Sequence, residues 1–207
     1  PRRGVQRGLC MVDATVGTVL AAGPDAAAYA WSPDSAYVAL LARLGGGPLR
    51  LVLQRAGSTV PVPLVEGDVT EASWSPDGTG LLVRIHESSG RTALRTVSVD
   101  GDPGIDLAAD CPAAEWAPGG GRLAFVEAAV DGTTHIVAAD RDGSGAVRAP
   151  IDARSAELHW SPDGARVACL TAGDTGTTRL RVLDAQTGSL TGLGEGLDIL
   201  GIAWAPD

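Results

Sequence analysis

Acidic residues recur in the stretch before each of the five tryptophans, and they are the side chains best suited to bind a charged partner. Ten of the 25 Asp and Glu residues fall in these stretches, with Arg154 as the only Arg among them: Asp25, Glu66, Asp68, Glu71, Asp110, Glu115, Asp152, Glu157, Glu195 and Asp198. If the fold gathers them at one rim, their negative potential would attract a cationic peptide, a basic protein surface or a metal ion. The alternative is ordinary solubilising charge on loops. Binding steered by charge would weaken with rising ionic strength, whereas a solvated rim would show no such dependence.

The candidate binding residues are the members of this set in the later repeats: Asp68, Glu71, Asp110, Glu115, Asp152, Glu157, Glu195 and Asp198.

Catalytic motifs are incomplete in the sequence. Gly143-Ser144-Gly145 lacks the spacing of a nucleophile elbow. His86-Glu87 is not followed by a second His four positions after the first, as a zinc peptidase helix requires. Gly119-Gly-Gly121 has neither the Lys nor the helix that complete a phosphate-binding loop.

The histidines and cysteines are scattered. Nothing near the histidines supplies the orienting partner that a catalytic triad needs, and they fall at different points of the chain: His86, His135 and His159. The three cysteines form neither a close pair nor a zinc-binding spacing, and we expect them to be small buried residues in strands: Cys10, Cys111 and Cys169. We therefore nominate no catalytic residue, no metal and no cofactor, and expect this chain not to be an enzyme.

The elements that position the acidic residues follow from the tryptophans, which recur at a nearly constant interval. They are separated by 43, 42, 44 and 44 residues: Trp31, Trp74, Trp116, Trp160 and Trp204. Each opens a similar motif: Trp31-Ser-Pro-Asp34, Trp74-Ser-Pro-Asp-Gly78, Trp116-Ala-Pro-Gly-Gly120, Trp160-Ser-Pro-Asp-Gly164 and Trp204-Ala-Pro-Asp207. Such a fixed period indicates a repeat architecture.

Each repeat contains four short β-type runs separated by Gly- and Asp-rich turns. The runs after the tryptophan motifs are 37–41, 81–85, 123–126 and 167–170, and the next ones are 49–53, 94–99, 135–138 and 180–183. Asp and Gly suit the turns because they tolerate positive φ. Four strands in about 43 residues are typical of a propeller blade, so the sequence predicts an all-β propeller of four-stranded antiparallel blades with almost no helix.

The period also predicts the blade boundaries. Residues 1–24 are expected to be the last strands of one blade and 198–207 the first strand of another, with four full blades between them at 25–67, 68–109, 110–153 and 154–197. Either the C-terminal strand joins the N-terminal pair in a three-stranded fifth blade that closes the ring, or the chain is a segment of a larger propeller. The absent initiator Met and the abrupt ends favour the segment.

The Trp-Ser-Pro-Asp-Gly motif, followed by a short apolar strand, resembles the WD40-like (PD40) repeat of the TolB propeller family, and the resemblance covers essentially the whole chain. It implies that each Trp ends an innermost strand and wedges between blades, while Pro-Asp-Gly shapes the first turn. Ser35 replaces Gly in the first repeat and Gly119 replaces Asp in the third, so these turns are expected to differ in detail.

The composition limits the classes of partner. The net charge is −9 and all 16 cationic residues are Arg, which argues against non-specific binding to nucleic acid or to an anionic membrane. No apolar run reaches the roughly 18 residues needed to span a bilayer. The chain lacks both Lys and Asn, which indicates a GC-rich, bacterial genome.

We expect a non-catalytic binding scaffold that presents one propeller face to a protein or peptide, with a cationic peptide as one option. One alternative is the accessory propeller of a serine peptidase resembling the prolyl oligopeptidase group, whose catalytic domain lies outside this chain. Another is a structural domain of an envelope-associated protein. The location stays open between the bacterial cytoplasm and the periplasm, because dispersed unpaired thiols are compatible with either.

Overall fold

The computed structural model is built from β-strands and turns. It describes residues 8–12, 19–24, 26–43, 47–58, 60–102, 104–129, 131–151, 156–172, 178–193, 199 and 201–205. Over these residues the chain forms no helix, and so none that is long and apolar enough to cross a membrane. The chain divides into two compact units, Pro1–Trp74 with Gly78–Gly104, and Ser75–Asp77 with Ile105–Asp207.

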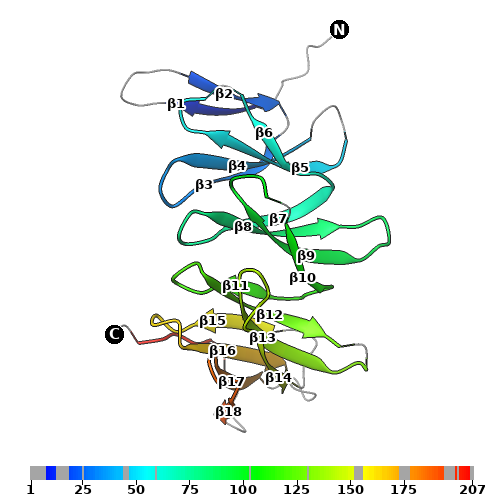
Figure 1. Cartoon of the computed structure of the whole chain (residues 1–207), viewed down its shortest axis with the longest axis vertical. Coiled ribbons are helices and arrows are strands. Elements are labelled where there is room, and N and C mark those ends of the chain that lie inside the picture. The colour runs from blue at the N-terminus through cyan, green and yellow to red at the C-terminus, as the bar shows by residue number, and fades with distance from the viewer. Residues whose placement is uncertain are drawn as a thin grey trace. The chain divides into compact units, whose positions relative to one another are not determined.

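The strands are short and follow one another closely (Figure 1). Those of the first unit are β1 (Gly8–Val12), β2 (Val19–Pro24), β3 (Ala26–Trp31), β4 (Tyr37–Arg43), β5 (Leu49–Arg55), β6 (Val62–Val65), β7 (Asp68–Trp74), β8 (Gly80–His86) and β9 (Thr92–Ser98). Those of the second are β10 (Ile105–Ala109), β11 (Ala114–Trp116), β12 (Arg122–Ala128), β13 (Thr134–Asp140), β14 (Val147–Ile151), β15 (Ala156–Trp160), β16 (Arg166–Ala172), β17 (Thr178–Asp184) and β18 (Leu190–Leu193).

The strands form four sheets of four strands each, and in every sheet the spatial order is the chain order. The sheets are β3 to β6, β7 to β10, β11 to β14 and β15 to β18, and β1 and β2 form a two-stranded sheet. Tight turns join antiparallel neighbours, such as β12 and β13, whose register pairs Arg122 with Asp140 and Ala128 with Thr134. Each four-stranded sheet is an antiparallel meander, which confirms the predicted fold class.

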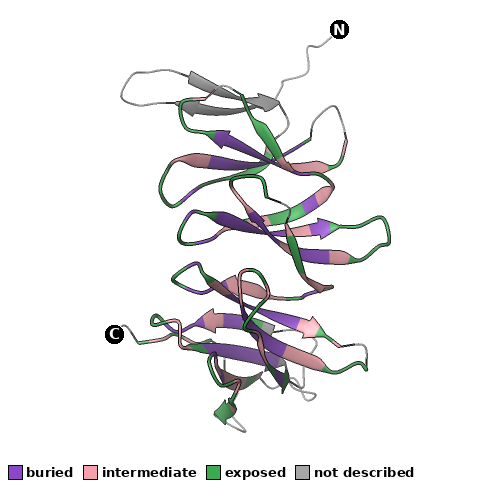
Figure 2. Cartoon of the chain, in the orientation of Figure 1, coloured by how far each residue is buried: buried purple, intermediate pink, exposed green. Residues whose placement is uncertain are grey.

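The middle strands of the sheets are the most buried. In β4 the five residues from Val38 to Ala42 are all buried. Since successive side chains of a strand point to opposite faces, such a run means that the sheet is covered on both faces. Figure 2 shows the same concentration of buried residues along the middle strands, with exposed residues at the turns.

Each unit has its own apolar core of small and aliphatic side chains. In the first unit, residues of β4 and β5 such as Leu51 pack with residues of β7 to β9 such as Leu81 and Val83. In the second, residues of β12 to β14 such as Ile136 pack with residues of β15 to β17 such as Leu183. Ala and Val fill much of both cores, which suits the narrow space between stacked sheets.

The ends of the chain leave two predictions open. Residues 201–205 belong to no strand in the described part of the chain. The prediction that residues 198–207 begin another blade, and the choice between a closed ring and a larger propeller, therefore stay predictions.

Candidate functional site

Four tryptophans end the first strand of a four-stranded sheet: Trp31, Trp74, Trp116 and Trp160. The indoles of Trp74, Trp160 and Trp204 hydrogen-bond to the chain one repeat earlier. The indole nitrogen Nε1 of Trp74 donates to the carbonyl oxygen of Ala30 at 3.0 Å. In the second unit, Trp160 Nε1 donates to Glu115 O at 3.2 Å, and Trp204 Nε1 donates to His159 O at 3.0 Å. These acceptors lie 44 or 45 residues before the donors. The bonds of Trp74 and Trp160 join the first strands of two sheets, β7 to β3 and β15 to β11, whereas Trp204 lies outside the described strands.

In three of the four-stranded sheets, the turn after the tryptophan is held by a serine and an aspartate. In the fourth sheet, Ser161 Oγ donates to Asp163 Oδ1 at 2.6 Å and accepts from the backbone nitrogen of Arg166 at 2.9 Å. The carboxylate of Asp163 also accepts from the nitrogen of Ala165, and these hydrogen bonds lower its pKa, led by that from Ser161. The side chains thereby satisfy backbone groups that the turn leaves unpaired.

The two altered turns keep the same backbone. Ser35 adopts a φ of 60°, close to the 72° of Gly78 and the 68° of Gly164. In the third sheet the nitrogen of Gly120 bonds to the carbonyl of Ala117 at 2.9 Å, as Gly164 does to Ser161. The expected difference therefore lies in the side chains: the third turn has Ala117 and Gly119 where the others have Ser and Asp.

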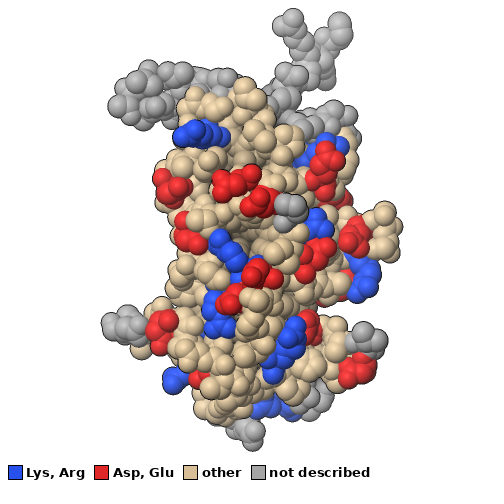
Figure 3. All heavy atoms as spheres, in the orientation of Figure 1, with Lys and Arg blue, Asp and Glu red and all other residues tan. Residues whose placement is uncertain are grey.

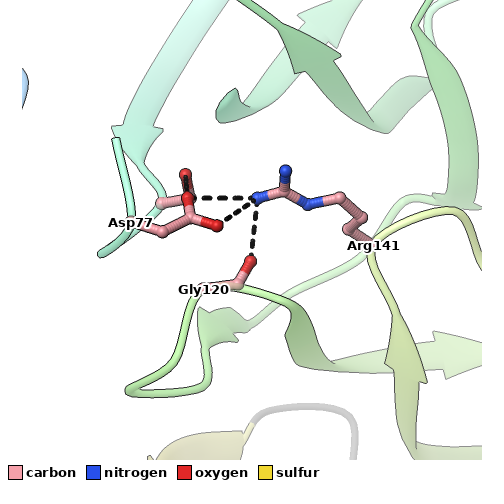
Figure 4. A network of polar contacts seen from close by, with 4 residues as sticks. Asp77, Gly120 and Arg141 are labelled. Carbon is pink, nitrogen blue, oxygen red and sulfur yellow. Dashed lines mark hydrogen bonds and ion pairs between the residues drawn. The ribbon is translucent and has the colours of Figure 1, made fainter. Parts of the chain in front are cut away.

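Arg141 occupies the space beside this third turn (Figure 4). Its Nη2 atom donates to the carbonyl oxygen of Gly120 at 2.9 Å and lies 3.3 and 3.2 Å from the two carboxylate oxygens of Asp77. The carbon of its guanidinium group lies 5.6 Å from the ring centre of Trp116, within range of a cation–π interaction. One side chain thus contacts a turn backbone, a carboxylate and an indole ring.

The other repeats have a small apolar residue at this position. The backbone nitrogen of Arg141 bonds to Gly121 O. The nitrogens that make the equivalent bonds belong to Ala56, Val99 and Ala185. Arg141 is therefore specific to the third sheet, where the turn lacks its own Ser–Asp pair.

The acidic residues of the first unit have partners on neighbouring strands. Glu71 on β7 binds Arg84 Nε on β8 at 2.7 Å, and Glu66 lies 3.6 Å from Arg50. The carboxylate of Asp68 accepts from the backbone nitrogen of Leu49 at 3.3 Å. The side chains of Glu66 and Glu71 remain 81% and 66% exposed.

The acidic residues of the second unit differ in burial. Glu157 binds the ring nitrogen Nε2 of His159 at 2.9 Å and is 65% exposed, and Asp110 is exposed with a φ of 50°. Glu115 is half-buried, and its Oε2 accepts from the backbone nitrogen of Trp160 at 3.2 Å. Burial raises the pKa of Glu115, while the charge of His159 and the bond from Trp160 act in the opposite direction.

Five of the acidic residues lie on or before the first strand of their sheets: Asp68, Glu71, Asp110, Glu115 and Glu157. That they form a binding rim stays a prediction. Other acidic residues named from the sequence lie outside the described residues: Asp25, Asp152, Glu195 and Asp198. Figure 3 shows acidic and basic side chains interspersed on the face in view. The sequence shows how many carboxylates precede the tryptophans, but it does not show which arginines pair with them. Arg50 and Arg84 lie on other strands, so their pairs with Glu66 and Glu71 can be recognised only when the strand pairing is known.

The cysteines and histidines are dispersed in the described part of the chain. Within that part, no three His, Cys, Asp or Glu side chains are grouped so that they could hold a metal ion. Cys169 is buried on β16, as expected, and burial raises the pKa of its thiol to about 12. Cys111 is also buried but lies between β10 and β11, so the prediction of a strand position was wrong for this residue. His86 and His135 lie on β8 and β13, in different sheets.

Comparison with known proteins identifies the fold. No family model and no curated protein matches the chain. Among solved structures, a putative TolB from Agrobacterium tumefaciens matches with a TM-score of 0.55 and 20% identity, over 84% of this chain and 72% of that one. The β-propeller domain of the Trilobed protease from Pyrococcus furiosus matches with a TM-score of 0.58 and 11% identity, over 77% of this chain and 54% of that one.

Puromycin hydrolase matches with a TM-score of 0.55 and 18% identity, over 81% of this chain but only 28% of the hydrolase. Identities this low establish the fold alone. Together with the four antiparallel meanders and the repeated tryptophan turns, these similarities show that the chain has a TolB-like β-propeller fold.

Proposed function

We propose that this chain is a non-catalytic binding scaffold. We further propose that the rim of each unit, where the first strands begin, binds a cationic segment of a protein or peptide. The observation that carries the proposal is the exposure of acidic side chains at this rim. Glu66, Glu71 and Glu157 are 81%, 66% and 65% exposed although each has a basic partner.

Such ion pairs leave the carboxylates available. An exposed pair contributes only about 0.2–1 kcal/mol, because water screens the attraction and two long side chains must be ordered. The 3.6 Å separation of Glu66 and Arg50 is too long for a direct hydrogen bond. An arginine or lysine of a partner would therefore compete at little cost for Glu66, whose side chain is 81% exposed.

The scaffold itself is suited to present such a rim. The turns after the tryptophans lie at the opposite ends of the same first strands. In three of the four-stranded sheets these turns are held by serine–aspartate bonds, such as that from Ser161 to Asp163 at 2.6 Å. A rigid framework lowers the entropy lost when a loop-borne site binds its partner.

The test is fluorescence anisotropy with a labelled arginine-rich peptide and an acidic peptide of equal length. We expect the basic peptide alone to bind, with an affinity that falls as the salt concentration rises. The triple variant Glu66→Gln, Glu71→Gln, Glu157→Gln should bind it about tenfold more weakly, a loss of about 1.4 kcal/mol.

The matched control removes three exposed charges from turns between third and fourth strands, at the other end of the sheets: Asp100→Asn, Asp102→Asn and Asp142→Asn. The net charge changes equally, so a specific rim requires that this control retain the parent affinity. Equal losses in both variants would indicate non-specific attraction to an acidic protein, and no binding of the basic peptide would remove the proposal.

A second candidate function is an accessory propeller of a peptidase. It is favoured by the similarity to the propeller domain of the Trilobed protease and to puromycin hydrolase, of which this chain spans only 28%. Sequencing the gene on both sides of this segment tests it. A hydrolase domain with a Gly-x-Ser-x-Gly motif in the same reading frame would support the accessory role.

A further inference from the structure

One face of the sheet β15 to β18 points away from the apolar core of the second unit. Val167, Cys169 and Leu183 belong to that core, so the residues that alternate with them point to the other face. The strand register arranges these residues in three rows across the sheet: Leu170, Leu180 and Leu193, then Ala168, Val182 and Thr191, then Arg166 and Asp184. Two of the rows are mainly apolar, and the third is charged.

The equivalent face of the sheet β11 to β14 is covered. Val126, Ile136 and Ala138 lie there and are 0% exposed, because they pack in one core with residues of β15 to β17 such as Trp160. On the sheet β15 to β18, by contrast, Leu193 is 47% exposed. Figure 2 shows β18 as mostly exposed. The same row pattern therefore leaves accessible apolar surface in this sheet.

This surface is hollowed into a groove, which we call the β18 groove. It consists of two adjoining hollows of about 350 Å³ and about 340 Å³ that share Val182, Leu193 and Trp204 as lining residues. The indole of Trp204 is held in place by its bond to His159 O at 3.0 Å. Such volumes lie at the lower end of the range of binding sites for small molecules, about 300–1,000 Å³. The groove therefore offers an apolar surface with one fixed aromatic wall.

Arg166 lines the charged end of the groove. In the sheet β11 to β14 the equivalent residue, Arg122, has its Nε atom 3.2 Å from Asp140 Oδ1. The guanidinium of Arg166 is exposed and, in the described part of the chain, forms no such ion pair. It is therefore available to an anion.

Two carboxylates lie near the same end, and both are bound within turns. Asp184 accepts from the backbone nitrogen of Thr187 at 2.8 Å, and Asp163 accepts from Ser161 Oγ at 2.6 Å. These bonds hold each carboxylate to its own turn. Arg166 is thus the group at this end that is suited to bind a ligand carboxylate.

We propose that the β18 groove binds the C-terminus of a partner peptide that ends in apolar residues. The apolar side chains lie against Val182, Leu193 and Trp204, and the terminal carboxylate binds Arg166. A guanidinium fits a carboxylate with two parallel N–H donors. Successive rows are two residues apart along each strand, or about 7 Å, so the ligand must carry its carboxylate close to an apolar group. The last residue of a peptide does so. This inference does not depend on the proposed binding of cationic segments at the acidic rim.

The test is fluorescence anisotropy with a labelled hexapeptide, Gly-Ser-Gly-Ser-Leu-Leu, as the free acid and as the C-terminal amide. We expect the free acid to bind about tenfold more tightly, because only the acid forms charge-assisted hydrogen bonds with a guanidinium. The free acid ending in Ser-Ser should not bind, because it lacks the apolar side chains. An amidated peptide with an internal Asp before Leu shows whether a side-chain carboxylate is sufficient. Equal binding of that peptide would contradict the assignment to a C-terminus.

Two variants separate the carboxylate from the apolar contact. Arg166→Gln should remove the preference for the free acid over the amide. Leu193→Ser should weaken the binding of both peptides, and it is compatible with folding because Leu193 is largely exposed. The matched control is Arg179→Gln, which removes an exposed arginine of β17 whose position alternates with Leu180 and so belongs to the other face. It should retain the preference of the parent protein.

Three results would overturn the proposal. The first is equal affinity of the parent for the free acid and the amide, and the second is an unchanged preference in Arg166→Gln. The third is no binding of either peptide at millimolar concentration. If the third result came with self-association in sedimentation experiments, it would show that another copy of the chain covers this face instead of a peptide.

Discussion

Asp77 and Arg141 are 64 residues apart in the sequence, yet the carboxylate of one lies 3.2 Å from the guanidinium of the other. Both side chains are only about one-third exposed, and Arg141 also donates to Gly120 O and lies over Trp116. The arrangement lies beside the turn after Trp116, which joins β11 to β12. Among the tryptophan turns of the four-stranded sheets, this is the one that lacks both Ser and Asp. We interpret Arg141 as the side chain that replaces the missing internal bonds of that turn.

Replacing Arg141 by alanine should destabilise the protein by about 1–2 kcal/mol. The variant loses a charge-assisted hydrogen bond, a partly exposed ion pair and a cation–π contact, each of modest worth at such exposure. Urea unfolding followed by tryptophan fluorescence measures the effect. Arg179→Ala removes an exposed arginine from β17 and should change the stability by less than about 0.5 kcal/mol. Equal stability of the two variants would contradict the role given to Arg141.

Gly120 should not tolerate a side chain. Its φ is +71°, and an added Cβ would lie 2.7 Å from the carboxyl carbon of Asp77 and 2.9 Å from its backbone nitrogen. We expect Gly120→Ala to lower the free energy of unfolding by about 1–3 kcal/mol, because the cost of a strained backbone adds to the cost of a steric clash. The neighbouring Gly119→Ala is the control, since a Cβ there meets no atom within 4 Å. Thermal melts of the two variants, made in parallel, decide whether the local packing is as described.

The indole hydrogen bond of Trp160 should be separable from its burial. Trp160→Phe keeps most of the aromatic surface but removes the donor to Glu115 O, so the expected loss is about 1 kcal/mol. Trp160→Ala also leaves a cavity and should cost about 3–5 kcal/mol. Trp31 is 47% exposed, so Trp31→Ala is expected to cost less than Trp160→Ala. The free energies of unfolding from urea titrations test this order, which a uniform loss at both positions would contradict.

The fold was predictable because its signals are local and repeated. The tryptophan spacing and the turn residues after each Trp define where first strands end, and the predicted runs 37–41, 81–85 and 123–126 lie within β4, β8 and β12. Backbone geometry even survives the substitution at Ser35, which adopts the φ that Gly adopts elsewhere. A structural repeat of this kind can be recognised in a single sequence because each repeat has the same pattern of residues.

The site was less predictable because its contacts join distant segments. The pairing of Asp77 with Arg141 needs the relative placement of two repeats, although one signal was present: Arg stands where the other repeats have Ala56, Val99 and Ala185. The pairing of Glu71 with Arg84 needs the strand register. A count of the carboxylates in loops includes neither of these ion pairs, so it overstates the unpaired negative charge at the rim.

The buried thiol of Cys169 gives a prediction about alkaline solution. Burial raises its pKa from 9.0 to about 12, so the folded protein holds the thiol proton at a pH at which the unfolded chain releases it. The unfolded state therefore gains from ionisation above about pH 9, and the contribution of this thiol to stability should decrease as the pH rises from there. Cys169→Ala removes that contribution, so the parent protein should lose more stability between about pH 8 and pH 10 than the variant does.

The burial of Cys169 also predicts that a thiol reagent labels this residue only after urea unfolding. Mass spectrometry of peptides labelled before and after unfolding measures this directly. Rapid labelling of Cys169 in the folded protein would show that β16 is more accessible than its fully buried side chain indicates.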